Sequence, residues 1–361
     1  MDPRIREQAS IIADYSTEIG SGDNVIIHVP TTAANLAVAL FECCGDRGAN
    51  PIFLNYDERA RRAYFTASDG DFETPGHELA LVEETDVYIA CRASTNATEL
   101  ADVAPSISSA YSKAIEPIRK RRLASRWCLT MFPAPGNAQL AGMSSEEYEN
   151  FVWDAINRDW PAQRAHQDQL VDLLNPADTV RIISGSETDI TMSIDGNMAI
   201  NDAGEHNLPG GEVFTAPIPE SVEGTVLFDK PIYYLGREIT DAYLEFEDGR
   251  VVNYQAKANE DLLHEILTTD SNADRLGELG IGMNRQIDRF SYNTLFDEKM
   301  GDTVHLAVGM AYDECVGPNN EVNESAIHVD MIVDMTTDSR IELDGTVIQQ
   351  DGQFTFESDE L

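Results

Sequence analysis

The sequence predicts two regions of different fold class: an α/β N-terminal domain with a mostly parallel sheet, and a β-rich α+β C-terminal domain. Three observations support this prediction. Short apolar runs alternate with helical periods in the first half of the 361 residues, a long helical stretch follows, and the second half consists of short strand-like segments separated by Gly-rich turns. A chain of this length typically forms about two domains. We place them at residues 1–180 and 181–361.

The first half contains four candidate strands with helical segments between them: residues 25–30 (VIIHVP), 51–56 (PIFLNY), 86–93 (DVYIACRA) and 127–132 (WCLTMF). Residues 33–48 have helical periodicity and end on Gly48, a common helix terminator. Strands interleaved with helices predict a parallel sheet with crossover helices. The turn at residues 30–34 lacks the Gly-rich pattern that lets a phosphate approach the backbone, so a nucleotide-binding domain is not favoured.

Residues 144–175 predict a helical connection between the domains. Ser144 is suited to cap the helix, acidic residues follow in its first turn, and Pro161 interrupts it. The segments after it have strand character, and Asp-Gly or other Gly-containing turns that favour hairpins separate several of them: residues 179–184, 189–194, 225–229, 242–254, 303–309 and 341–349.

The composition is strongly acidic. The formal net charge is -39, from 64 acidic and 25 basic residues, and lysine occurs at only five positions: 113, 120, 230, 257 and 299. Dispersed acid with scarce lysine is typical of proteins from extreme halophiles, because concentrated salt screens the self-repulsion of such a surface. A phosphate backbone requires clustered Lys and Arg, so we expect no nucleic-acid partner.

The apolar pattern indicates a cytoplasmic protein that does not enter membranes. No run of eighteen apolar residues is present, and residues 1–16 lack the order of a secretory signal. The five cysteines are odd in number and have no CxxC spacing. This pattern predicts reduced thiols and argues against a disulfide framework or a cysteine zinc site.

Residues 325–335 (SAIHVDMIVDM) resemble a buried strand that carries an imidazole and a carboxylate. Side chains two residues apart on a strand share a face, so His328 and Asp330 should project together while Val329 and Met331 point the other way. Such a pair is either a hydrogen-bonded structural couple or half of a metal site.

Further candidate ligands stand in three other segments of the C-terminal half. Glu212 follows Gly210 and Gly211, which permit a tight turn, and Glu278 lies among glycines. The third segment, residues 295–312, supplies Glu298, His305 and Tyr312. Each has an ordinary alternative: a solvated acid, a core histidine or a packed tyrosine. Together, however, the carboxylates of Glu212, Glu278, Glu298 and Asp330 would balance two divalent cations, and carboxylate with imidazole is a suitable donor set for a dinuclear site.

Four ordered segments, GGEVFTAP, GELGIGMN, LFDEK followed by HLAVGMAY, and NESAIHVDMIVDM, resemble the aminopeptidase T family of dinuclear metallopeptidases, also called the thermophilic or leucyl aminopeptidase family. The resemblance extends over nearly the whole chain. It implies a homodimer that acts on peptides with two divalent ions, of zinc, cobalt, manganese or magnesium. It also implies Tyr312 as a catalytic tyrosine, and metal ligands at Glu212, Glu278, Glu298, His305, His328 and Asp330.

The chain departs from the family pattern after Glu298. We expect Asn at the next position in many members, and this chain has Lys299. We expect the change to alter the local charge and the preferred metal without affecting a ligand.

The mechanism implied is hydrolysis of the first peptide bond by a water that bridges two metal ions. Tyr312 would donate a hydrogen bond to the oxyanion, and Glu212 or Glu278 would carry the proton to the leaving amine. His305 and Tyr312 are seven residues apart and would lie on opposite faces of a continuous strand, so the chain must bend after Gly309.

Two alternatives use the same residues differently. Another dinuclear metallohydrolase, such as a phosphoesterase, has the same ligand types. In a non-catalytic acidic binding protein, the carboxylates would be solvated and the histidines would belong to the core.

Overall fold

The computed structural model describes residues 1–234 and 236–360, with side chains up to residue 357. The chain forms two compact units: Met1–Arg158 with Gly204–Gly210, and Asp159–Ala203 with Gly211 to the C-terminus. The boundary predicted at residue 180 therefore falls inside the second unit. Residues 204–210 also return to the first unit, because β8 (Asn207–Leu208) pairs with a strand of its sheet.

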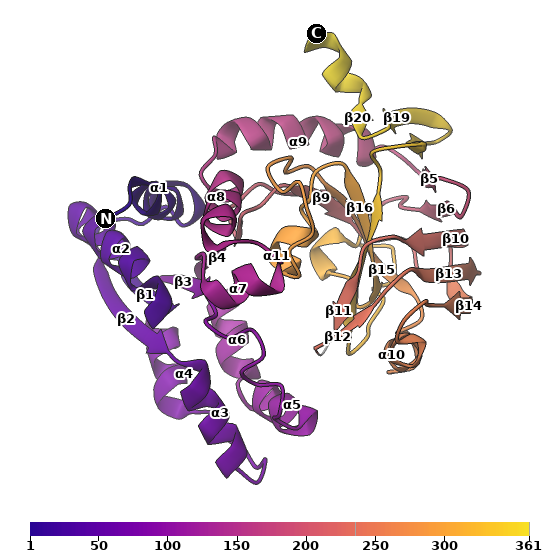
Figure 1. The fold of residues 1–361 in the computed structure, drawn as a ribbon. Helices are drawn as coiled ribbons and strands as arrows, with labels where there is room; N and C mark the ends of the chain where they lie inside the picture. The colour runs from indigo at the N-terminus through magenta and orange to yellow at the C-terminus, as the bar shows by residue number, and fades with distance from the viewer. Residues whose placement is uncertain (235, 361) are drawn as a thin grey trace. The chain divides into compact units, whose positions relative to one another are not determined.

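The N-terminal unit contains a five-stranded parallel sheet, as the alternation of strands and helices predicted (Figure 1). Its strand order is β2 (Asn50–Tyr56), β1 (Asn24–Pro30), β3 (Val87–Arg92), β4 (Arg126–Met131) and β8. The inner strands β1 and β3 are mostly buried, whereas the edge strand β2 is mostly exposed. This difference is expected because helices cover the inner strands of a parallel sheet.

Eight α-helices belong to the described part of the N-terminal unit: α1 (Pro3–Ile11), α2 (Ala34–Arg47), α3 (Glu58–Ala67), α4 (Gly76–Glu83), α5 (Pro105–Ala114), α6 (Glu116–Leu123), α7 (Pro135–Leu140) and α8 (Ser145–Ile156). Helix α2 ends on Gly48 in the left-handed conformation, and the Ser144 hydroxyl caps α8 by accepting the Glu147 N–H. Both features follow the sequence prediction.

The C-terminal unit contains two larger antiparallel sheets and a short two-stranded one (Figure 1). The eight-stranded sheet has the order β14 (Arg250–Gln255), β13 (Ala242–Glu247), β10 (Glu223–Phe228), β6 (Thr188–Ser193), β5 (Thr179–Ser184), β18 (Ser339–Leu343), β19 (Thr346–Gln350) and β20 (Gln353–Phe354). The five-stranded sheet has the order β17 (His328–Asp334), β16 (Thr303–Gly309), β15 (Leu276–Gly282), β9 (Glu212–Thr215) and β7 (Ile200–Asp202).

The short sheet pairs β11 (Ile232–Tyr234) with β12 (Arg237–Ile239), and the α-helices of this unit are α9 (Trp160–Leu174), α10 (Glu260–Leu267) and α11 (Thr294–Asp297). The helix predicted over residues 144–175 is thus two helices, with Pro161 in the first turn of the second. In the described residues, every helix is too short or too polar to cross a bilayer.

The five-stranded sheet separates the core of its unit from a polar face. One set of alternating side chains, which includes Val213, Leu279, Leu306 and Met331, packs into the large apolar core shared with the eight-stranded sheet. The other set contains five of the six predicted ligands, because Gly282 pairs with Glu212, Gly280 with His305, Gly309 with His328, and Ala307 with both Glu278 and Asp330. Strand register thus brings side chains from four strands onto one face.

One histidine of the N-terminal unit should make stability depend on pH. His28 on β1 is largely buried, its Nδ1 lies 2.6 Å from the Tyr88 hydroxyl, and burial, with smaller effects of Arg61 and Arg122, lowers its pKa to about 4. The unfolded chain takes up this proton near pH 6.5 and the folded chain does not. The free energy of unfolding should therefore fall as pH drops from about 6.5 to about 4, by about 3 kcal/mol from this residue.

Denaturant unfolding of the wild type and of His28→Gln at pH 7 and pH 4.5 measures this contribution. The wild type should lose more stability than the variant over this interval. His77→Gln, at an exposed histidine, is the control and should behave as the wild type does. Equal losses in all three proteins would contradict the prediction.

Candidate metal centre

Five of the six predicted ligands converge on the polar face of the five-stranded sheet. They form two groups whose ligand atoms lie within 4.8 Å of one another: Glu212, Glu278 and His305, and Glu278, His328 and Asp330. Glu278 belongs to both groups. The predicted pairing of His328 with Asp330 on one face of β17 is confirmed, with Nε2 of His328 3.3 Å from Oδ1 of Asp330.

Glu278 lies between the two histidines. Its Oε1 is 3.1 Å from His305 Nε2, and its Oε2 is 3.5 Å from His328 Nε2. Glu212 completes the first group, with Oε2 3.4 Å from His305 Nε2. Glu212 and Glu278 are each 5% exposed and His305 is fully buried. The reading of these acids as solvated turn residues is therefore wrong.

Two glycines make this arrangement possible. A Cβ on Gly280 would lie 1.9 Å from Nε2 of His305, so any other residue would displace the ring. Gly309 has a φ of +100° at the end of β16, where the chain turns as the sequence required for His305 and Tyr312 to share one side. The glycines around Glu278 and Ile281 in GELGIG (residues 277–282) were the sequence signal for the first of these positions.

The imidazole of His328 is oriented by a hydrogen bond at its second ring nitrogen and by packing against Tyr312. Nδ1 of His328 lies 2.8 Å from the backbone carbonyl of Met310, so an N–H at Nδ1 donates to that oxygen and leaves Nε2 to face the carboxylates. The Tyr312 ring packs against His328 with the centroids 5.0 Å apart, and its side chain is 40% exposed. Burial, and then the carboxylates of Glu278 and Asp330, raise the pKa of Tyr312, which keeps its hydroxyl protonated.

The carboxylates require positive charge. Burial raises the pKa of Glu212 to about 8, although the Lys299 ammonium opposes this effect. Burial lowers the pKa values of His305 and His328, but the neighbouring carboxylates outweigh it and raise them to about 9 and about 10. In the absence of metal, both imidazoles therefore hold protons that compensate for the acids.

The donor set fits divalent cations. Among the described residues, Glu212 Oε2, Glu278 Oε2 and Asp330 Oδ1 are buried oxygens without a hydrogen-bond donor, and all three lie in the two groups. Buried carboxylate oxygens left without donors are costly unless a cation binds them. Carboxylate oxygen and imidazole nitrogen are ligands of zinc, cobalt, manganese and magnesium in different proportions.

Glu298 and Lys299 lie beside the two ligand groups. Glu298 follows α11 and lies outside both groups of ligand atoms. Lys299, which we expected to leave the ligands unaffected, is fully buried, and its Nζ donates to Glu212 Oε1 at 2.8 Å and to Glu298 Oε1. Asp202 at the end of β7 lies 3.5 Å from the same Nζ, and the sequence contained no signal for it. The acidic cluster thus includes its own buried cation.

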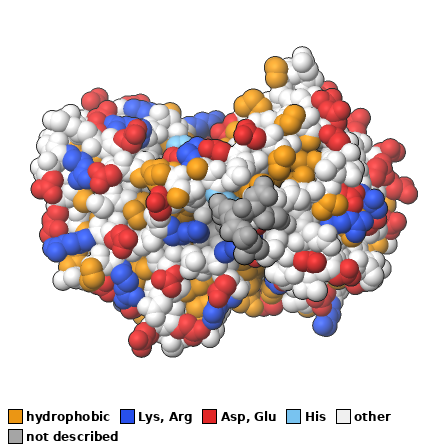
Figure 2. Space-filling view, turned by 90° about the horizontal axis from the view of Figure 1, so that it is seen from above, with side chains coloured by type: hydrophobic (Ala, Val, Ile, Leu, Met, Phe, Trp, Pro, Cys, Tyr) orange, Lys and Arg blue, Asp and Glu red, His pale blue; other side chains and the backbone are white. Residues whose placement is uncertain are grey.

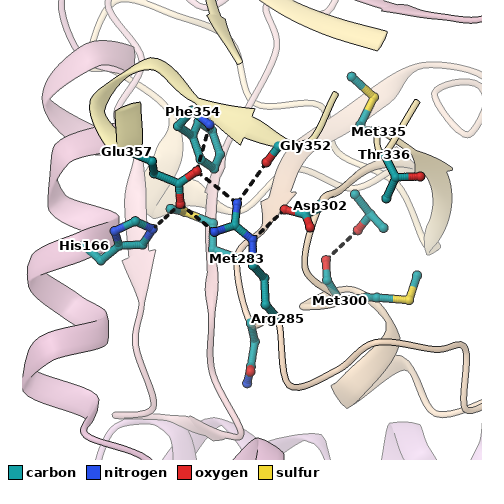
Figure 3. Close-up of polar contacts among 12 residues, drawn as sticks. His166, Met283, Arg285, Met300, Asp302, Met335, Thr336, Gly352, Phe354 and Glu357 are labelled. Atoms are coloured by element: carbon teal, nitrogen blue, oxygen red, sulfur yellow. Dashed lines mark hydrogen bonds and ion pairs between the residues drawn. The ribbon is translucent and has the colours of Figure 1, made fainter. Parts of the chain in front are cut away.

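An ion-pair network anchors the segment that carries Glu298 and Lys299 (Figure 3). Nε of Arg285 donates to Asp302 at 2.8 Å, and its Nη1 donates to Glu357 at 2.6 Å. Glu357 also lies 3.1 Å from Nε2 of His166 on α9. Arg285 therefore joins the two ends of residues 285–302 to each other and to the C-terminal segment that carries Gly352 and Glu357.

A cavity of about 150 Å³ opens beside the cluster. Glu298, His328 and Asp330 line it, and most of its other lining residues are aromatic or aliphatic, among them Ile232, Tyr233, Tyr234, Phe290 and Tyr292. Asp297 holds one wall, because its carboxylate accepts hydrogen bonds from the Ser291 N–H and hydroxyl and from the Asn293 N–H.

Comparison with known proteins places the chain in a family. Residues 1–354 match the family model described as thermophilic metalloprotease (M29). Aminopeptidase 2 of Geobacillus stearothermophilus is 28% identical over 387 aligned residues that cover 92% of each chain. Aminopeptidase T of Thermus thermophilus is 30% identical over 275 aligned residues that cover 66% of each.

Two solved structures share the fold. AmpT from Thermus thermophilus superposes with a TM-score of 0.86 at 24% identity, over 98% of this chain and 99% of the other. A 2,5-dihydroxypyridine dioxygenase from Pseudomonas putida KT2440 superposes with a TM-score of 0.62 at 14% identity, over 98% of each. These likenesses confirm the α/β and β-rich architecture. Because the family model matches nearly the whole length, the chain belongs to the thermophilic metalloprotease family M29.

Proposed function

We propose that this protein is a metal-dependent aminopeptidase that removes the N-terminal residue of peptides at a site holding two divalent ions. The observation that carries the two-ion proposal is the shared position of Glu278, whose two oxygens face two different groups of ligands. Family membership and the aminopeptidase relatives support the hydrolase activity. The non-catalytic alternative is not favoured, because its carboxylates would be dispersed and solvated.

We assign ligand roles to Glu212, Glu278, His305, His328 and Asp330, and keep Glu298, which lines the cavity beside them, as the sixth ligand. Bound divalent ions would supply Lewis acidity toward the scissile carbonyl and lower the pKa of a water molecule. Tyr312, protonated and next to His328, is suited to donate a hydrogen bond to the developing oxyanion. One of the carboxylates of the centre, Glu212 or Glu278, would carry the proton to the leaving amine.

Hydrolysis of aminoacyl-anilides in high salt, with and without a chelator, tests this function. We expect chelator-sensitive release of the N-terminal residue by the wild type, and none by His328→Ala. His264→Ala is the matched control, because His264 contacts Tyr254 outside the cluster. Activity that survives in His328→Ala counts against the site, and release of phosphate from phosphoesters without peptide hydrolysis would favour the phosphoesterase alternative.

The cavity predicts a preference for large apolar N-terminal residues. Its aromatic walls offer apolar contact area to a side chain of the substrate. The Asp297 carboxylate already accepts three hydrogen bonds from the protein, so it is not needed to bind a polar substrate group. In Phe290→Ala, the ratio of kcat/KM for phenylalanyl-anilide over alanyl-anilide should fall about tenfold, because the smaller substrate never contacts that wall. Tyr254→Ala, on β14, should leave the ratio unchanged, and an unchanged ratio in Phe290→Ala would refute the assignment.

We further propose that the enzyme acts in the cytoplasm of a halophile as a homodimer. All five cysteines are free thiols and four are buried, which suits a reducing compartment. Val38 and Phe41 of α2 and Ile52 and Phe53 of β2 are exposed, and a second copy of the chain would cover them. Sedimentation equilibrium in 2 M KCl tests the dimer, and a monomer mass would contradict it.

A further inference from the structure

Lys299 is an ammonium enclosed by acids at the edge of the metal centre. Its side chain has no exposure to solvent. Nζ donates to Glu212 Oε1 at 2.8 Å and to Glu298 Oε1, and it lies 3.5 Å from Asp202 Oδ2. These three acids come from the start of β9, the end of α11 and the end of β7, so one side chain joins three parts of the fold.

The backbone fixes Lys299 in this position. Its N–H donates to the Phe296 carbonyl at 3.0 Å, and its carbonyl accepts the Asn284 N–H at 3.0 Å. Asn284 is itself fully buried and follows β15, which carries Glu278. The ammonium is therefore held against the carboxylates from a rigid part of the C-terminal unit.

The contact selects which oxygen of Glu212 is available to a metal. Oε1 is occupied by Lys299, whereas Oε2 faces His305 Nε2 at 3.4 Å and is one of the buried oxygens without a donor among the described residues. Glu298 is restricted in the same way, since its Oε1 also contacts Nζ. A carboxylate with one oxygen so held presents a single, oriented oxygen to an ion.

Lys299 also completes the charge balance of the cluster. Ionised Glu212, Glu278, Glu298, Asp330 and Asp202 carry five negative charges, and Lys299 carries one positive charge. The difference, four negative charges, equals the charge of two divalent ions. The sequence alone indicated the same four negative charges from Glu212, Glu278, Glu298 and Asp330. Adding Asp202 and Lys299 does not change this total, because their opposite charges cancel.

The contact is asymmetric between the two ligand groups. Lys299 hydrogen-bonds to Glu212, which belongs to the first group. In the described part of the chain it forms no ion pair with Glu278 or Asp330, the carboxylates of the second group. We propose that Lys299 is a positioning residue: it holds Glu212 with Oε2 toward His305 and so sets the affinity of the ion bound by Glu212, Glu278 and His305. This inference rests on the proposed two-ion site.

The test is metal titration of metal-free Lys299→Met, which keeps an unbranched side chain without the ammonium. Competition with a coloured chelator gives the affinity of each ion, and the absorption of bound Co²⁺ reports its coordination. We expect the wild type to bind two ions. In Lys299→Met one of them should bind 10- to 100-fold more weakly, the usual effect of removing a partner of a ligand, while the other binds as in the wild type.

Lys230→Met is the matched control, because Nζ of Lys230 pairs with Asp334 at 2.7 Å in the same unit, and neither residue belongs to a ligand group. It should bind both ions with wild-type affinity. Since Lys299→Met leaves buried carboxylates without a partner, we include Lys299→Met/Asp202→Asn, which restores the net charge, and confirm folding of each variant by circular dichroism.

The outcomes separate the alternatives. If positioning is the role of Lys299, the double variant still binds one ion weakly, because Oε1 of Glu212 remains without its donor. Wild-type affinity for both ions in a folded Lys299→Met or in the double variant overturns the inference and leaves the metal site intact. A wild type that binds no divalent ion would instead overturn the proposed function.

Discussion

Replacing Glu278 by Gln should abolish peptide hydrolysis and remove both metal ions. Glu278 is shared by the two ligand groups, with Oε1 toward His305 and Oε2 toward His328. An amide keeps the shape but offers one oxygen, and its NH₂ cannot ligate a cation. We expect kcat/KM to fall at least about 10³-fold, which corresponds to about 4 kcal/mol of lost transition-state stabilisation. Anilide kinetics and metal analysis of the purified variant measure both effects.

Two further variants should give a smaller effect and no effect: Glu212→Gln and Glu247→Gln. Glu212 belongs to one group, so its replacement should weaken one ion and retain the other. Glu247 is an exposed acid on β13, and its replacement should change neither metal content nor rate. Two tightly bound ions in Glu278→Gln would refute the shared-ligand arrangement.

Lowering the salt concentration should unfold the protein. Acidic side chains are scattered across the face shown in Figure 2, in keeping with 64 acidic and 25 basic residues in the chain. The Debye length is about 10 Å at 0.1 M salt and about 3 Å at 1 M, so the repulsion between these side chains is screened only in concentrated salt. Between 0.1 and 2 M KCl, the free energy of unfolding should rise by several kcal/mol, because many weak repulsions between acidic side chains are screened together. Urea denaturation, which adds no ions, measures it.

A charge variant distinguishes screening from other effects of salt. Replacing Glu7, Glu83, Glu247 and Glu265, all exposed, by Gln should shift the stability curve to lower salt. Sucrose at matched osmolality is the control for the effects of KCl other than screening. It is excluded from the protein surface but does not screen charge, so it should stabilise the protein less than KCl does. An unfolding midpoint that is independent of KCl would remove the basis for the halophilic proposal.

Much of the centre was predictable because it depends on short sequence distances. The period of two along a strand was sufficient to place His328 and Asp330 together, and Gly309 was the correct position for the turn that brings Tyr312 beside His328. The four ordered segments predicted the family, which the family model confirms. Segment 204–210 was not predictable as part of the first unit, since the pairing of β8 with β4 depends on residues far apart in the chain.

The role of Lys299 shows what long-range register decides. The sequence showed a lysine where Asn was expected, yet its contact with Glu212 joins residues 87 positions apart. The local sequence period predicts which face of a strand or helix a side chain occupies, because backbone geometry repeats within a few residues. It does not state which strands are neighbours or how far each is shifted along the next. The residue types of a metal centre and their faces were therefore present in the sequence. The sharing of Glu278, the choice of oxygen at Glu212 and the buried ammonium were decided by the packing of β7, β9, β15, β16 and β17.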